Sequence, residues 1–240
     1  MSKRDVINNS HSWVHCWFRL IAAYLTSFGI NANAYTVVVD PGHGGSDRGA
    51  TQGTIIESGI ALNVAQKLAE KFKDSKTTKI ILTRGGDLAV SLKQRTKIAE
   101  LKGADLFVSL HGNSSTDRRA KGAEFYIGTS KPSHENSQSP TRVDRIVSEL
   151  NYNARLFQSQ YLATDTFRVW QTSPVSKPRA VRQAPFYVIN KNSVPSILVE
   201  FGFITHAQES QELLKDETQD AIAENLRFAI EGFRKNSIKK

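Results

Sequence analysis

Short apolar runs rich in β-branched residues recur along the chain, each bounded by polar or glycine-containing turns. Runs of this kind are typical of strands that are buried on both faces of a sheet. Four runs are strong, at 35–40, 79–84, 106–110 and 196–200, and two are shorter, at 124–127 and 186–189. The pattern therefore predicts a sheet of about six strands.

Between these runs, apolar residues recur at helical spacing. Ile60, Val64 and Leu68 repeat every four residues, which places them on one face of a helix. Similar spacing occurs at 91–101 and 219–233. Strands that alternate with helices predict a single α/β domain, with a mixed, largely parallel sheet and helices on both faces.

The first 34 residues follow a different pattern from the rest of the chain. Lys3 and Arg4 give a basic start, an apolar run follows at 20–30, and Ala-Asn-Ala ends the segment at 32–34. This order indicates a secretory signal peptide, and the alternative is an uncleaved amphipathic leader. The apolar run is too short and too polar for a stable membrane span. We therefore divide the chain into a signal peptide, 1–34, and an exported catalytic domain, 35–240, that ends in a basic tail, 234–240.

Charge and cysteine content narrow the choice of partners. The chain has 32 Lys+Arg against 23 Asp+Glu, a net charge of +9. The leader holds Lys3, Arg4, Arg19 and Asp5, so the remainder keeps 29 basic and 22 acidic residues, a net charge of +7. This excess suggests a polyanionic partner. The basic residues are scattered, which argues against nucleic acid. The single cysteine, Cys16, lies in the leader, so a disulfide framework is excluded and export is favoured.

Four side chains that can bind metal or carry protons stand at the ends of predicted elements. His43 lies on a glycine-rich turn after the first strand, and His111 directly follows the third. Glu200 stands at the tip of the last strong run, and Glu57 opens the helix that contains Ile60. Ligands of open α/β sheets bind at the carboxyl ends of the strands, so we expect these four groups to converge.

His43, Glu57 and His111 form a sensible zinc set, because two imidazoles and one carboxylate leave a fourth position open. Zinc at such a site would acidify water and polarise a carbonyl. Glu200 is then free to carry a proton as the catalytic residue. Taken singly, each residue is more typical of a structural role. A glutamate that opens a helix, such as Glu57, usually interacts with the helix dipole. Their convergence favours a zinc hydrolase.

Several separated motifs also occur in the order typical of a known family. They are VVVDPGHGG, the Glu after the next short segment, LTR with Asp three positions on, SLHGN, RQAPFYVI and VPSILVEFGFIT. Over about 35–233 the chain resembles the zinc-dependent N-acetylmuramoyl-L-alanine amidases of the Amidase_3 type. The resemblance implies His43, Glu57 and His111 as ligands of one Zn²⁺ and Glu200 as the catalytic glutamate. It implies peptidoglycan as substrate, cut between the lactyl group of N-acetylmuramic acid and L-Ala of the stem peptide.

Three further residues are candidates for substrate binding. Arg182 and Gln183 stand just before the predicted strand at 186–189 and are expected to contact substrate carboxylates, with structural capping as the alternative. Asn113 is expected near the zinc-bound water. Asp40 and Asp47 lie close to His43 in the sequence and are expected to orient it or its turn.

The chain departs from some members of the family after the second His motif. Periplasmic members that resemble it insert a long helix there, which blocks the zinc until a partner protein withdraws it. Here a polar loop at 130–142 and one core helix with a modest extension are predicted, so we expect no full-length blocking helix. Partial cover of the cleft by 143–150 and a need for a protein activator stay open.

The sequence thus predicts an exported monomer in the periplasm or cell-wall space that acts in cell-wall remodelling, cell separation or cell division. No wall-binding repeat is evident, so positive charge would target the domain to the wall. Two alternatives remain. One is a zinc peptidase or carboxypeptidase that trims stem peptides, and the other is a catalytically silent peptidoglycan-binding protein.

Overall fold

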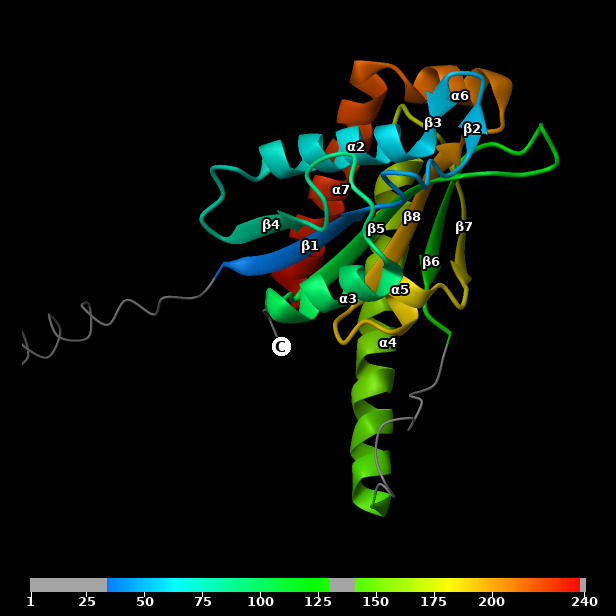
Figure 1. Ribbon diagram of the computed structural model, residues 1–240. Helices are drawn as coiled ribbons and strands as arrows, with labels where there is room; N and C mark the ends of the chain where they lie inside the picture. Colours follow the sequence, from blue (N-terminus) through cyan, green and yellow to red (C-terminus); the bar gives the residue numbers. More distant parts are fainter. Residues whose placement is uncertain (1–33, 130–140, 238–240) are drawn as a thin grey trace, which may run out of the picture. The chain divides into compact units, whose positions relative to one another are not determined.

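The main sheet has six strands in the order β4-β1-β5-β8-β6-β7 (Figure 1). The computed structural model describes residues 34–129 and 141–237. The strands are β1 (Tyr35–Pro41), β4 (Thr78–Leu82), β5 (Leu106–Asn113), β6 (Ala123–Ile127), β7 (Pro178–Gln183) and β8 (Ser196–Phe203). The first four strands in the sheet order are parallel, β6 is antiparallel to β8, and β7 is parallel to β6. A small separate hairpin pairs β2 (Thr51–Gln52) with β3 (Ile55–Ile56). The predicted mixed, largely parallel sheet is confirmed.

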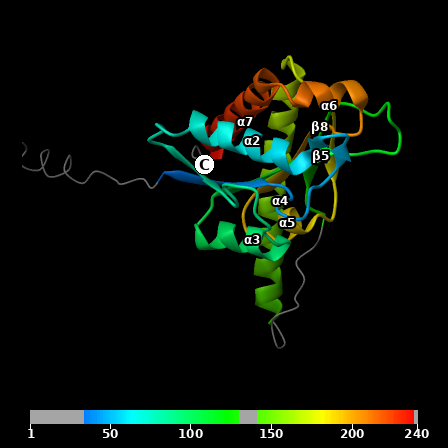
Figure 2. The same cartoon turned by 45° about the horizontal axis from the view of Figure 1, so that its top comes forward.

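Helices cover both faces of this sheet, as predicted (Figures 1 and 2). One face packs against α2 (Glu57–Lys71), α4 (Arg142–Gln171) and α7 (Asp216–Ser237). The other packs against α3 (Leu92–Leu101) and α5 (Tyr187–Asn190), and α6 (Ala207–Leu213) follows β8. The larger core lies on the α2 face and contains the fully buried Trp170 and Phe201.

Strand alternation decides which residues face α3 and α5. Successive side chains of a strand point to opposite faces of the sheet. In β5, Val108 and Leu110 belong to the larger core, and Phe107 belongs to the smaller core under α3 and α5. His111 therefore lies on the same face as Phe107. The same alternation puts Glu200 on that face, two residues after Leu198 of the smaller core.

Two sequence predictions about the sheet are wrong. The segment 186–189 is not a strand, because Tyr187–Asn190 forms the short helix α5, whose Val188 and Ile189 are buried in the smaller core. The sixth strand is β7, so Arg182 and Gln183 lie within a strand rather than before one. β5 and β8 also continue past the predicted ends, which places His111 and Glu200 inside strands.

Helix α4 differs from the prediction of a core helix with a modest extension. A capping box at Thr141 and Asp144 fixes its start. None of residues 142–158 is buried, whereas Leu162 and Trp170 are. The first half of α4 therefore extends beyond the core, as Figure 1 shows.

The described residues form one compact unit. No helix among them combines the length and apolar character that a membrane span requires. The predicted signal peptide, apart from Ala34, lies outside the described residues, as does most of the predicted loop at 130–142. Both stay predictions.

Candidate metal centre

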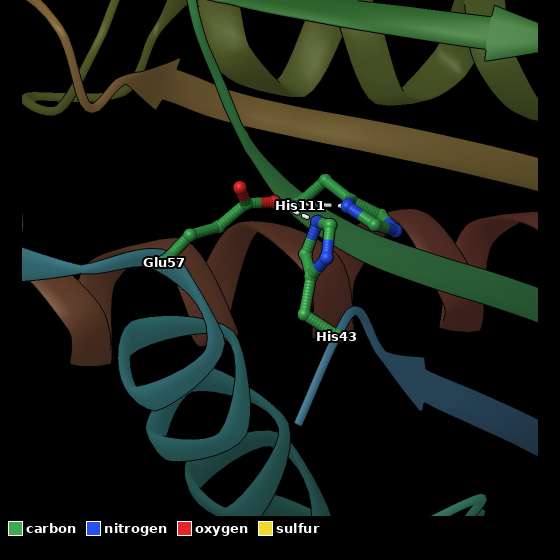
Figure 3. Close-up of side chains that lie close together, drawn as sticks. All are labelled: His43, Glu57 and His111. Atoms are coloured by element: carbon green, nitrogen blue, oxygen red, sulfur yellow. Dashed lines mark hydrogen bonds and ion pairs between the residues drawn. The ribbon is translucent and has the colours of Figure 1, made fainter. Parts of the chain in front are cut away.

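Three side chains from separate elements meet at the carboxyl ends of β1 and β5 (Figure 3). His43 stands in the loop after β1, Glu57 is the first residue of α2, and His111 lies in β5. Glu57 Oε1 lies 3.0 Å from His43 Nε2 and 2.9 Å from His111 Nδ1. The two imidazole rings meet edge to face, with centroids 4.9 Å apart. The structure therefore brings together all three residues that the sequence predicts as metal ligands.

Glu57 is buried and held by the backbone as well as by the histidines. Its Oε2 accepts a hydrogen bond from Ala50 N at 2.7 Å, and its Oε1 accepts one from Gly112 N at 3.1 Å. Burial works against its charged form, but the hydrogen bonds with His111 and His43 outweigh burial and lower the pKa of Glu57 to about 2. The carboxylate is thus ionised and can act as a ligand at neutral pH.

His43 is oriented from both sides of its ring. Its Nδ1 lies 2.8 Å from Asp47 Oδ2, so that Nε2 points to Glu57. The hydrogen bond with Glu57 is the main reason that the pKa of His43 rises to about 9, against the opposing effect of burial. Asp47 holds His43 as carboxylates commonly hold metal-binding histidines. The expected role of Asp47 as an orienting partner agrees with this contact.

Two glycines are required by the close approach of the ligands. A Cβ on Gly42 would lie 2.2 Å from His111 Cε1. A Cβ on Gly49, whose φ is +67°, would lie 2.5 Å from Glu57 Oε2. His43 itself has φ 56°, an uncommon backbone conformation for a residue other than glycine. The glycine-rich turn therefore leaves space for the three side chains.

A buried arginine ties the His43 loop to the start of α2. Arg84 donates from Nε to Pro41 O at 3.0 Å and from Nη2 to Gly42 O at 2.7 Å. The same Nη2 donates to Ser58 O at 2.8 Å. Because Ser58 directly follows Glu57, this guanidinium links the backbone beside two of the three candidate ligands.

A second buried arginine holds the same loop through Asp40. Arg95 Nη1 donates to Asp40 Oδ1, and Nη2 donates to His43 O, both at 2.7 Å. Asp40 is fully buried and also accepts from Thr83 Oγ1 at 2.6 Å and Ser109 Oγ at 2.9 Å. Asp40 therefore supports the turn through Arg95.

Glu200 lies beside the three candidate ligands. In the β5–β8 ladder it is the register partner of His111. Its Oε2 is buried and has no hydrogen-bond partner among the described residues. Burial raises the pKa of Glu200 to about 7. The electrostatic effect of His111 opposes this rise but is smaller than that of burial, and the nearby Glu57 adds to the rise. A carboxyl group in this state can both accept and release a proton near neutral pH.

The predicted substrate-binding residues divide into two groups. Asn113 and Arg182 both reach Glu124, at 3.0 Å and 3.4 Å. Gln183 is exposed at the end of β7 and, by strand alternation, points away from the face of Arg182. Glu124, which lies in the short apolar run at 124–127, was not among the residues that the sequence singled out.

A hollow of about 490 Å³ opens beside His43 and His111. Its lining includes residues from the β1 loop, the start of α3 and α5, among them Asp47, Arg95 and Val188. No residue of α4 lines it. The sequence left open whether the region 143–150 covers part of the cleft. Two of its residues, Asp144 and Val147, line a separate groove together with the loop at 190–195.

The donor set fits a single zinc ion. One ligand atom from each of His43, Glu57 and His111 lies within 4.8 Å of the others, and zinc bonds to nitrogen and oxygen are about 2 Å long. Small side-chain movements would bring all three atoms to one ion. Two imidazoles with one carboxylate are a ligand set known from catalytic zinc sites.

Comparison with known proteins finds relatives that match most of this chain. AmiA, an N-acetylmuramoyl-L-alanine amidase of Escherichia coli (strain K12), is 32% identical over 219 residues, which cover 79% of this chain and 74% of AmiA. A putative N-acetylmuramoyl-L-alanine amidase of Buchnera aphidicola is 29% identical, covering 85% of this chain and 98% of the relative.

A solved structure agrees with these relatives. N-acetylmuramoyl-L-alanine amidase AmiC2 of Nostoc punctiforme matches with a TM-score of 0.68 and 30% identity, over 83% of this chain and 97% of that one. The family model Amidase_3, described as N-acetylmuramoyl-L-alanine amidase, matches residues 37–232, which include all three candidate ligands and Glu200. The chain therefore belongs to the Amidase_3 family of N-acetylmuramoyl-L-alanine amidases, which are hydrolases.

Proposed function

We propose that this chain is a zinc-dependent amidase that hydrolyses the bond between the lactyl group of N-acetylmuramic acid and L-Ala of the stem peptide. The observation that carries the proposal is the cluster of His43, Glu57 and His111 beside Glu200, whose Oε2 is buried, within the family match. The three clustered residues would hold one Zn²⁺. When bound, zinc supplies Lewis acidity that polarises a carbonyl oxygen and acidifies water.

Glu200 would move the proton that the reaction requires. Hydrolysis adds water to the amide carbon, breaks the C–N bond and leaves a lactyl carboxylate and the free amino group of L-Ala. Glu200 takes the proton from the attacking water and delivers it to the leaving nitrogen. Its buried, unpartnered Oε2 and its raised pKa support this role.

The substrate would extend from the metal centre toward β6 and β7. Arg182, which is half exposed in β7, would contact a substrate carboxylate, and Asn113 lies at the end of the strand that carries His111. Gln183 is exposed at the end of β7 but faces the opposite side of the sheet from Arg182, so it is not part of this contact. Asp47 and the two buried arginines, Arg84 and Arg95, would keep the ligand loop in place.

The cellular setting follows from the sequence and the substrate. We propose export by the signal peptide at 1–34 and action on the wall in the periplasm or cell-wall space, in remodelling, cell separation or division. The net charge of +9, of which two units belong to the leader, would attract the protein to wall polymers that carry carboxylates and phosphates. We further propose that the protein is a monomer. Whether it needs a protein activator is tested by assaying the purified protein alone.

Mass spectrometry of digested sacculi tests this function. Residues 35–240 should release peptides with a free amino-terminal L-Ala, and a chelator should stop this release until zinc is restored. Products cut within the stem peptide would favour the peptidase alternative. Bound zinc with no product of either kind would favour a silent binding protein.

Substitution of Gly42 tests the packing of the metal centre. Gly42→Ala should weaken zinc binding at least about tenfold. The new Cβ would lie 2.2 Å from His111 Cε1, so the His111 ring would have to move and could no longer bind zinc together with His43 and Glu57. Competition with a zinc chelator measures the change. Gly59→Ala is the matched control, since nothing lies within 4 Å of a Cβ there. Equal zinc affinity of the two variants would contradict the prediction.

A further inference from the structure

Glu124 is a buried carboxylate next to the catalytic candidate. In the antiparallel β6–β8 ladder it is the register partner of Glu200. Directly opposed residues on neighbouring strands have Cβ atoms about 4.5–5.5 Å apart, so the two carboxyl groups share one region of the sheet. Only 7% of the Glu124 side chain is exposed. A second buried acid beside Glu200 requires partners, and the structure provides four.

The two oxygens of Glu124 are held in different ways. Oε2 accepts short hydrogen bonds from neutral donors, Tyr126 Oη at 2.7 Å and Asn113 Nδ2 at 3.0 Å. Oε1 faces two guanidinium groups at longer range, with Arg179 Nε and Arg182 Nη2 each at 3.4 Å. Charge-assisted N–H···O bonds are usually about 2.7–2.9 Å long. Neither arginine is therefore fully engaged by Glu124.

These arginines retain capacity for a further anion. A guanidinium has five N–H donors in a planar fork that matches a carboxylate. The side chains of Arg179 and Arg182 are 38% and 51% exposed, so their free donors can reach a ligand from solvent. Two guanidinium groups therefore face the single carboxylate of Glu124, so the arginines outnumber the acid that they both contact.

We propose that Glu124 is a positioning residue that aligns Asn113, Tyr126 and Arg182 into a wall that recognises a carboxylate of the stem peptide. The inference rests on the proposed function and extends it to a residue that selects the substrate. Tyr126 is fixed by its bond to Glu124, and burial together with that bond raises its pKa, so its hydroxyl stays protonated. Arg179, which also donates to Lys121 O, limits how far the wall can shift.

A pair of substrates tests this recognition. Both are synthetic N-acetylmuramoyl peptides that begin with L-Ala. In one the residue after L-Ala has a free α-carboxylate, and in its twin that group is a carboxamide. The wild-type protein should have a kcat/KM about 10- to 100-fold higher for the carboxylate substrate, through KM, because a hydrogen bond to a charged group is lost in the twin.

Two variants separate recognition from folding. Arg182→Gln should reduce this preference to about threefold or less, and because the side chain is half exposed the fold should be kept. Glu124→Gln should lose the preference similarly, through a raised KM for the carboxylate substrate. A purely structural defect would lower activity on both twins alike. Arg168→Gln, at a 68% exposed arginine of α4, is the control and should keep the full preference.

Several results would overturn the inference. Equal kcat/KM of the wild type for both twins would show that no carboxylate is recognised here. Full or increased preference in Glu124→Gln would show that Glu124 competes for Arg182 rather than positions it. Cleavage of neither twin at the lactyl–L-Ala bond would overturn the proposed function itself, and this inference with it, and it is readily told apart from loss of selectivity.

Discussion

Glu200→Gln should lower kcat about 10²- to 10⁴-fold, the usual contribution of a positioned acid–base group. The amide keeps the size of the side chain but cannot accept the proton of the attacking water. Because Glu200 is not among the clustered ligand atoms, bound zinc should be unchanged. Rates of L-Ala release from sacculi and zinc content by atomic spectroscopy measure the two effects.

An exposed glutamate supplies the control for this variant. Glu100 pairs with Lys97 on the surface of α3, so Glu100→Gln should keep wild-type turnover. If Glu200→Gln released L-Ala peptides at the wild-type rate, the proton-transfer role would be wrong. If it lost zinc as well as turnover, Glu200 would belong to the ligand set.

Asp40→Asn should lower the free energy of unfolding by about 3–5 kcal/mol, the usual cost of removing one partner of a buried ion pair. Asp40 is fully buried, and Arg95 would keep its charge without a counter-ion. An amide NH₂ would also oppose the hydroxyl donors of Thr83 or Ser109. The variant should show a lower denaturant midpoint in urea and weaker zinc binding, since Arg95 also holds His43 O.

Chemical denaturation of metal-free protein measures the stability change without the contribution of zinc. Glu212→Gln removes a half-exposed partner of Lys215 and should leave the midpoint almost unchanged. Similar midpoints for wild type and Asp40→Asn would mean that the buried network does not support the fold.

The fold could be predicted well where burial is continuous along a strand. β1, β5 and β8 are buried almost throughout, so their sequences are mostly apolar. β7 was missed because it is an edge strand that begins with a proline and has a half-exposed sequence in which three of the six residues are polar. The segment 186–189 has the apolar content of a strand, but only Val188 and Ile189 fill the smaller core, as part of a short helix, and Phe186 and Tyr187 are exposed.

Some residues of the candidate site could be predicted from local sequence patterns, and others could not. His43 stands on a glycine-rich turn and Glu57 at the start of a helix, both of which the sequence pattern marks, and His111 directly follows an apolar run, so all three could be identified. Glu124 could not be assigned, because its position depends on β6 lying antiparallel to β8, and no local pattern specifies which strands become neighbours. The position of Arg182 depends on a second pairing, that of β7 with β6.

In the sheet, residues of the apolar core and residues of the candidate site are direct neighbours along the same strand. In β8, Val199 and Phe201 are in the larger core, and Glu200 between them is on the face of the metal centre. A one-residue shift of a strand exchanges its two faces. A deletion within β8 would therefore carry the Glu200 carboxylate into the core and bring an apolar neighbour, Val199 or Phe201, to its place. Surface loops can vary in length without this exchange, whereas one inserted or missing residue in this strand would disrupt the core and the metal centre together.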